Sequence, residues 1–141
     1  MNETRVYIDT SAYFAMLVGE RRGVEIKSFL IGKVVCSSIL LLLEAERNLV
    51  RLSREKKLRP DEYANSMVQL KEDRELFLLK DVSVELCLTN LFPPVQIPKT
   101  NDLIHLRTAL WFRNNGGLDI FVTLDENQKR AAIDFGLQVF T

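Results

Sequence analysis

Four isolated acidic residues are the part of this sequence best suited to chemistry. Each lies beside an apolar segment rather than in the charged stretches where acids usually collect: Asp9, Glu44, Asp102 and Asp125. A carboxylate at the margin of a protein core is costly unless it is paired, hydrogen-bonded or bound to metal. If the fold brings these four together, their mutual repulsion requires a cation. Hard oxygen ligands of this kind suit Mg²⁺ or Mn²⁺.

The elements that would position these acids alternate between short apolar strands and helices. We predict strands over residues 5–8, 33–36, 120–123 and 137–140, with a weaker strand candidate over 81–84. We predict helices over residues 11–18, 23–31, 38–57, 60–79, 85–91, 101–113 and 126–135. Short buried strands that alternate with helices are typical of parallel sheets with right-handed crossovers. The sequence therefore predicts one α/β domain over residues 1–141.

Residues that favour helix starts precede two of the predicted helices. Ser37 and Ser38 are expected to cap the long third helix, because a serine hydroxyl can accept a hydrogen bond from the first turn. Thr100 or Asn101 is expected to cap the helix that carries Asp102 in the same way. Prolines at 93, 94 and 98 predict an irregular link before that helix.

The predicted elements bring the four acids to one edge of the sheet. Ligand sites of open parallel sheets lie beyond the carboxyl ends of the strands. Asp9 and Asp125 directly follow predicted strands, whereas Glu44 and Asp102 fall in the early turns of helices. We therefore expect all four carboxylates to line one cleft. Asp119 is a possible extra acid near this site, and we interpret it as a turn residue before a strand rather than as a fifth member.

The charge of the chain is balanced overall but uneven locally. The 19 basic and 19 acidic residues give a net charge of zero, which argues against binding nucleic acid by bulk electrostatics. At about 100° per residue, Glu44 shares a helical stripe with three arginines. These are Arg47, Arg51 and Arg54. The stripe could hold a few phosphates, or it could be an ordinary solvated face with a Glu44–Arg47 pair, and both interpretations stay open.

Three further residues could have been reactive but have simpler interpretations. Cys36 and Cys87 lie in apolar segments and are expected to be small core residues of a reducing compartment. The only histidine, His105, is expected to be a packed or hydrogen-bonded core residue rather than a catalytic base. No apolar run reaches membrane-spanning length and no signal peptide is visible, so we expect a cytoplasmic protein.

Four segments of the chain resemble, in the same order, the motifs of PIN-domain ribonucleases. Each segment contains one of the four acids, and they are residues 6–13, 37–47, 100–106 and 121–128. The resemblance spans residues 5–140, and within the family the chain looks most like the toxin halves of VapBC toxin–antitoxin modules. Arg107 departs from the pattern, since the family often has a small residue at that position.

The resemblance implies a three-layer α/β/α PIN-like fold with a central, mainly parallel sheet of about five short strands. It implies an endoribonuclease that depends on Mg²⁺ or Mn²⁺, with an RNA substrate and a cognate antitoxin. A homodimer that associates through a helical face is expected separately, because the helices are rich in apolar residues. The catalytic metal ligands would be Asp9, Glu44, Asp102 and Asp125. Thr123, with Thr10 or Ser11, would hold water or orient a carboxylate. Arg47, Arg51 and Arg54 would then contact RNA.

Two other functions stay open at this point. A PIN-like module could bind RNA or a protein with little catalysis, although the four intact acids argue against lost activity. A housekeeping RNA-processing nuclease would share the same site without an antitoxin. A haloacid-dehalogenase-like phosphatase is disfavoured, because it needs a second aspartate two residues after the first, where this chain has Ser11.

The early helices are rich in apolar side chains. Those between residues 13 and 30 could form a groove for a partner helix, or they could complete a small core. The sequence leaves the two interpretations evenly balanced.

Overall fold

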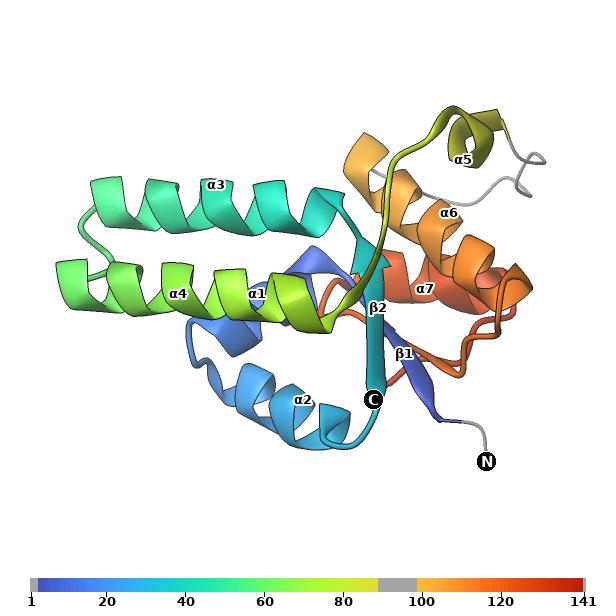
Figure 1. Ribbon diagram of the computed structural model, residues 1–141, viewed down its shortest axis with the longest axis horizontal. Coiled ribbons are helices and arrows are strands. Elements are labelled where there is room, and N and C mark those ends of the chain that lie inside the picture. The colour runs from blue at the N-terminus through green and yellow to red at the C-terminus, as the bar shows by residue number, and fades with distance from the viewer. Residues whose placement is uncertain (1–2, 89–98, 141) are drawn as a thin grey trace.

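A parallel sheet divides the molecule into two helical layers (Figure 1). The computed structural model describes residues 3–88 and 99–140. The strands are β1 (Arg5–Ile8), β2 (Val34–Ser38), β3 (Leu78–Lys80) and β4 (Ile120–Val122). The helices are α1 (Thr10–Leu17), α2 (Arg21–Leu30), α3 (Leu40–Arg54), α4 (Pro60–Leu76), α5 (Val84–Leu88), α6 (Thr100–Asn114) and α7 (Glu126–Asp134). Helices α1 to α4 lie on one side of the sheet and α6 and α7 on the other, so the three-layer α/β/α prediction is confirmed.

The strands pair in the order β3-β2-β1-β4, and every pairing is parallel. Central strand β1 is covered on both faces, which explains why its residues 6–8 form an unbroken apolar run. The expected strand over residues 137–140 is reduced to a single bridge between Phe121 and Val139 beside β4. The sheet therefore has four strands plus this bridge, close to the five expected.

Successive side chains of β1 point into two separate hydrophobic cores. Val6 and Ile8 point into the core formed with α1 to α4, whereas Tyr7 points into the core formed with α6 and α7. Tyr7 stacks on Phe121 of β4 in this second core, with ring centroids 5.3 Å apart. The strand that ends at Asp9 is thus held rigidly from both sides.

The apolar residues of the early helices belong to the first core. Tyr13 and Ile26 are fully buried there, and Phe14 and Phe29 pack against the same cluster with partial exposure. They complete a core, and Tyr13, Met16 and Leu17 also line a small cavity of about 50 Å³ between α1, α2 and α4. Helix α2 packs closely on α1 at Gly23, where an added Cβ would lie 2.1 Å from the carbonyl oxygen of Ala15.

Three predicted boundaries are wrong for physical reasons. Ser37 and Ser38 end β2 rather than begin a helix, and the hydroxyl of Ser37 donates to the carbonyl of Ile8 over 2.7 Å. The hydroxyl of Ser38 does accept from the backbone N–H of Leu40, the first residue of α3, over 3.1 Å, so the expected serine cap is confirmed for Ser38 alone. Strand β3 lies over residues 78–80 instead of 81–84, because pairing with the open edge of β2 overrides the local helical pattern. Lys99, not Thr100 or Asn101, occupies the cap position of α6 and makes no capping bond through its side chain.

The two cysteines differ in environment. Cys36 is buried in the second core, as predicted, but Cys87 is exposed, so its interpretation as a core residue is wrong. The predicted proline-rich link at 93–98 lies outside the described residues. Within residues 3–88 and 99–140, no helix has the length and apolarity needed to cross a membrane.

Candidate active site

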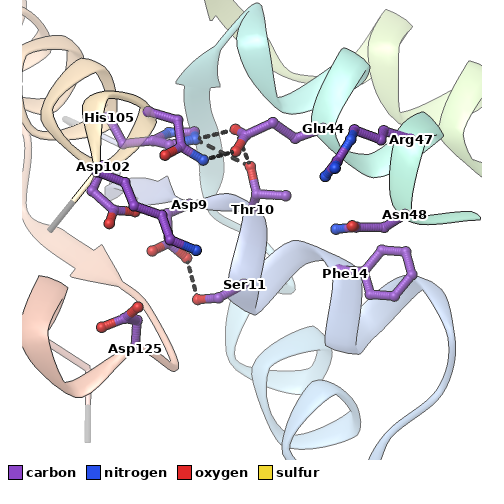
Figure 2. A pocket seen from close by; sticks show the side chains of 12 residues that line it. Asp9, Thr10, Ser11, Phe14, Glu44, Arg47, Asn48, Asp102, His105 and Asp125 are labelled. Atoms are coloured by element: carbon purple, nitrogen blue, oxygen red, sulfur yellow. Dashed lines mark hydrogen bonds and ion pairs between the residues drawn. The ribbon is translucent and has the colours of Figure 1, made fainter. Parts of the chain in front are cut away.

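A cavity of about 470 Å³ opens at the carboxyl ends of β1 and β4, and all four predicted acids line it (Figure 2). Asp9 follows β1, Asp125 begins α7 after β4, and Glu44 and Asp102 project from the early turns of α3 and α6. The topology accounts for this gathering, because the carboxyl ends of parallel strands meet at the same edge.

Asp9 is the most deeply buried of the four acids, with 4% of its surface exposed. Its Oδ1 caps α1 by accepting from the backbone N–H of Ala12, and it also accepts from the Ser11 hydroxyl over 2.7 Å. Its Oδ2 accepts from the hydroxyl of Thr123. Burial raises the pKa of Asp9, and these hydrogen bonds together with nearby His105 offset only part of that rise.

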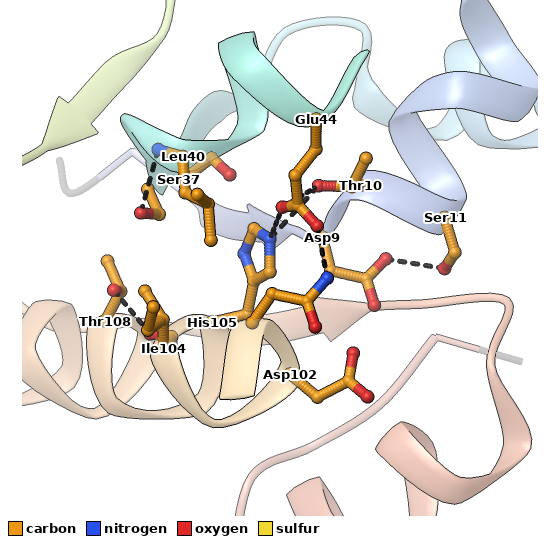
Figure 3. Close-up of polar contacts among 12 residues, drawn as sticks. Asp9, Thr10, Ser11, Ser37, Leu40, Glu44, Asp102, Ile104, His105 and Thr108 are labelled. Carbon is orange, nitrogen blue, oxygen red and sulfur yellow. Dashed lines mark hydrogen bonds and ion pairs between the residues drawn. The ribbon is translucent and has the colours of Figure 1, made fainter. Parts of the chain in front are cut away.

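Glu44 is oriented by three donors from α1 and α6 (Figure 3). Oε1 accepts from the Thr10 hydroxyl over 2.7 Å and lies 2.8 Å from Nε2 of His105, while Oε2 accepts from the Asn101 amide over 2.5 Å. Burial by itself would raise the pKa of Glu44, but the hydrogen bonds from His105, Thr10 and Asn101 bring it below its usual value. Glu44 is therefore held ionised and fixed in direction.

His105 links Glu44 to the buried residue Tyr7. Its Nδ1 lies 2.7 Å from the hydroxyl of Tyr7, a fully buried residue whose pKa burial raises well above its usual value. The Tyr7 hydroxyl consequently keeps its proton. Because the ionised Glu44 can only accept, the ring hydrogen that faces it is on Nε2, and in this neutral tautomer Nδ1 accepts from the Tyr7 hydroxyl. His105 is buried and hydrogen-bonded as expected, but it also forms part of the wall of the acidic cavity.

The other three acids influence one another. Burial raises the pKa of Asp102, and the charges of Asp125 and Asp9 raise it further. Thr123 connects two of these acids, because its hydroxyl accepts from the backbone N–H of Asp125 while donating to Asp9. The cavity therefore holds like charges in close proximity, an arrangement that a cation would stabilise.

The expected four-carboxylate metal cluster is not assembled. Among residues 3–88 and 99–140, no three His, Cys, Asp or Glu side chains are grouped around a common ion position. Glu44 turns toward His105, away from Asp102 (Figure 3). The donors nevertheless fit Mg²⁺ or Mn²⁺ in kind, since Asp9, Asp102 and Asp125 offer hard oxygens whose repulsion a divalent cation would remove. Mg²⁺ commonly takes one or two carboxylates and keeps several waters.

The remaining predicted residues divide between this cavity and other surfaces. Arg47 lines the cavity and is exposed, whereas Arg51 pairs with Glu55 over 3.4 Å and, like Arg54, lies outside the cavity lining. Asp119 lies at the amino end of β4, at the opposite edge of the sheet, where it accepts from the backbone N–H of Arg5 over 2.8 Å. Only Arg47 of the basic stripe is placed to meet a ligand in the cavity.

Several cavity residues were not identified from the sequence. Asn101 directly precedes the motif residue Asp102, and His105 follows it by three positions, a spacing that places Asp102 and His105 on one helix face. That spacing was the available signal. Asn48, Lys99 and Phe14 also line the cavity, and no sequence pattern distinguished them. Arg107, the departure from the family pattern, donates to the carbonyl of Leu86 and so joins α6 to α5.

Comparison with protein-family models gives a match over most of the chain. A family model described as PIN domain matches residues 6–134, which is most of the chain and includes all four acids. A search of curated proteins found no match.

Proposed function

We propose that this chain, which belongs to the PIN-domain family, is a divalent-metal-dependent endoribonuclease. The family is one of nuclease-type folds, so hydrolysis of nucleic acid is the activity expected of it. One observation carries the proposal for this chain: all four motif acids line one cavity, where burial and the charges of Asp125 and Asp9 raise the pKa of Asp102.

The chain's own residues hold the carboxylates in place. Ser11 and Thr123 fix both oxygens of Asp9, and the backbone N–H groups that begin α7 fix Asp125. Glu44 is held by donors from α1 and α6. A divalent ion bound by these acids would lower the pKa of a water molecule and neutralise charge on the scissile phosphate. Fixed carboxylates need little reorganisation when such a site is used.

RNA is proposed as the substrate from the resemblance of the four motifs to PIN-domain ribonucleases. The same resemblance leads us to propose the toxin of a cytoplasmic toxin–antitoxin module, acting as a homodimer and inhibited by a cognate antitoxin. A binding module with little turnover is the alternative, and the absence of an assembled ligand group among the described residues is what favours it.

A cleavage assay with matched variants tests the activity. Purified protein is incubated with single-stranded and hairpin RNA, with Mg²⁺, Mn²⁺ or chelator. We expect cleavage only with metal, and at least about a 10²-fold loss in Asp9→Asn, because loss of one electrostatic group at a reacting centre typically costs that much. Asp119→Asn, which alters an acid at the other edge of the sheet, should keep its activity. Cleavage that survives chelation would contradict the mechanism.

The toxin proposal has a separate test. Expression of the wild-type chain in bacteria should arrest growth, whereas expression of Asp125→Asn should not. Growth arrest that is equal in both would show that the carboxylates are not responsible. A chain that cuts RNA without arresting growth, and whose gene has no small upstream neighbour, would be assigned to RNA processing instead.

A further inference from the structure

The acidic cavity has a second end, where two polar side chains have no partner among the residues that the structure describes. Arg47 and Asn48 of α3 line it together with Phe14 of α1. Within residues 3–88 and 99–140, neither Arg47 nor Asn48 makes a side-chain hydrogen bond or ion pair. Figure 2 shows these three residues together on one side of the cavity, with Asp9, Asp102 and Asp125 on the other.

Some neighbouring side chains have structural partners, whereas Arg54 and Lys56, like Arg47, have none among the described residues. In the same basic segment, Arg51 and Lys57 both pair with Glu55. Asn101, the other amide in the cavity, donates to Glu44. Arg47 and Asn48 combine a place in the cavity lining with no partner among the described residues, so both are available to a ligand there.

Phe14 supplies an apolar surface at the same end. It is half-buried, and in the part of the chain that the structure describes its ring contacts no other aromatic ring. Its neighbour Tyr13, in contrast, is buried and packs edge-on against Phe77. A partly exposed aromatic ring beside unpaired hydrogen-bonding groups is the combination that binds an unstacked nucleobase.

We propose that Phe14, Asn48 and Arg47 form a nucleotide subsite, which holds one unpaired base of single-stranded RNA beside the carboxylates. The base stacks on Phe14, the Asn48 amide donates to and accepts from its edge, and Arg47 binds a flanking phosphate. The cavity volume of about 470 Å³ lies within the range of roughly 300–1,000 Å³ typical of small-ligand sites. The inference rests on the proposed ribonuclease function and assigns its substrate class.

Single-stranded RNA is favoured because a base within a duplex is stacked and paired, so it cannot enter a cavity whose aromatic wall lies beside the reacting groups. The net charge of zero also favours single-stranded RNA. A protein without bulk positive charge must obtain affinity from specific contacts such as stacking, rather than from many phosphates.

Three variants with matched controls test the subsite. Phe14→Leu, Asn48→Ala and Arg47→Gln are compared with Phe29→Leu, Asn65→Ala and Arg21→Gln, whose parent residues lie outside the cavity lining. We expect kcat/KM on single-stranded RNA to fall at least about fivefold in the first two cavity variants, as loss of a stacked base contact does. The controls should stay within about twofold. Asn48→Ala keeps the test decisive if Phe14→Leu does not fold.

A modified substrate separates base stacking from general damage to the site. An RNA with a single abasic residue is made for each position flanking the cut. At one position, the missing base should slow the wild type by the same factor as Phe14→Leu, and combining the two should cost nothing further, because both remove the same contact. Fully additive effects at every position would overturn the stacking assignment.

Failure of the subsite can be told apart from failure of the nuclease. Full activity in Phe14→Leu and Asn48→Ala would overturn the subsite while leaving the ribonuclease proposal intact. If the wild type cuts nothing, fluorescence anisotropy of labelled single-stranded RNA on Asp125→Asn gives the answer. In the Asp125→Asn background, RNA affinity that falls with Phe14→Leu or Asn48→Ala but not with the control substitutions would support the subsite without supporting the nuclease activity. Equal affinity for duplex RNA or for single-stranded DNA would overturn the assigned substrate.

Discussion

Nε2 of His105 lies 2.8 Å from Oε1 of Glu44, although the two residues are 61 positions apart in the chain. The contact joins α6 to α3 across the end of β1, and the Tyr7 hydroxyl extends it into the core of the protein. The direction of Glu44 is therefore set by a buried network, and the acid is part of the fold as well as of the candidate site.

Replacing Tyr7 by Phe should destabilise the protein by about 1–3 kcal/mol, because it leaves the buried Nδ1 of His105 without a donor. His105→Gln, which can still donate to Glu44, should lower nuclease activity less than His105→Ala. Denaturant unfolding and cleavage rates of the same preparations check both statements. If the His105→Gln and His105→Ala variants lost the same cleavage activity while differing in stability, the result would show that His105 does not position Glu44.

Asp102→Asn should raise the unfolding midpoint of the metal-free protein at pH 7. The pKa of Asp102 is raised in the folded state, so the folded protein holds this proton more tightly than the unfolded chain does. The stability contributed by the protonated group is complete below the unfolded pKa of about 3.9 and is lost as pH rises through the folded pKa. The benefit of the variant should therefore vanish in acid.

Thermal unfolding in chelator between pH 3.5 and 8 measures this difference. Glu72→Gln, which alters an exposed acid on α4, is the control and should show no comparable gain. A gain for Asp102→Asn that persists unchanged at the acid end would mean that the effect is not electrostatic.

Millimolar Mn²⁺ should raise the unfolding midpoint of the wild type more than that of Asp125→Asn. A ligand that binds only the folded state stabilises it by mass action, and the repulsion among Asp9, Asp102 and Asp125 gives the ion its site. Differential scanning calorimetry at several metal concentrations provides the measurement. Asp119→Asn should respond as the wild type does. Equal responses in all three proteins would show that Asp125 does not bind the ion.

Gly23→Ala should destabilise the protein by more than about 2 kcal/mol, which is at the upper end of typical overpacking costs. The new Cβ would lie 2.1 Å from the carbonyl oxygen of Ala15, so α1 and α2 would have to separate. Because α1 carries Thr10, Ser11 and Phe14, activity should fall as well. Ser28→Ala on the exposed face of α2 is the control. A Gly23→Ala protein with wild-type stability would show that the two helices can move apart freely.

Several features could be predicted from the sequence because they depend on neighbouring residues. The apolar runs that form β1 and β4, and the acids that follow them, are visible as short segments, and parallel topology then requires Asp9 and Asp125 to share an edge. The same local logic places Asp119 before β4, which is why it lies at the opposite edge. Helix α4 begins at Pro60, as its acidic first turn indicates.

The tertiary structure alone decided the contacts between residues that are far apart in the chain. Strand β3 formed over residues 78–80 because β2 offered an open edge, against the local helical pattern. The hydroxyl of Tyr7 meets His105 from 98 positions away, and that contact turns Glu44 aside from the other acids. Propensity and periodicity act over a few residues, whereas hydrogen bonds within a core depend on which elements pack together. The sequence therefore determined which acids gather, and the packing of α1, α3 and α6 decided how each one is held.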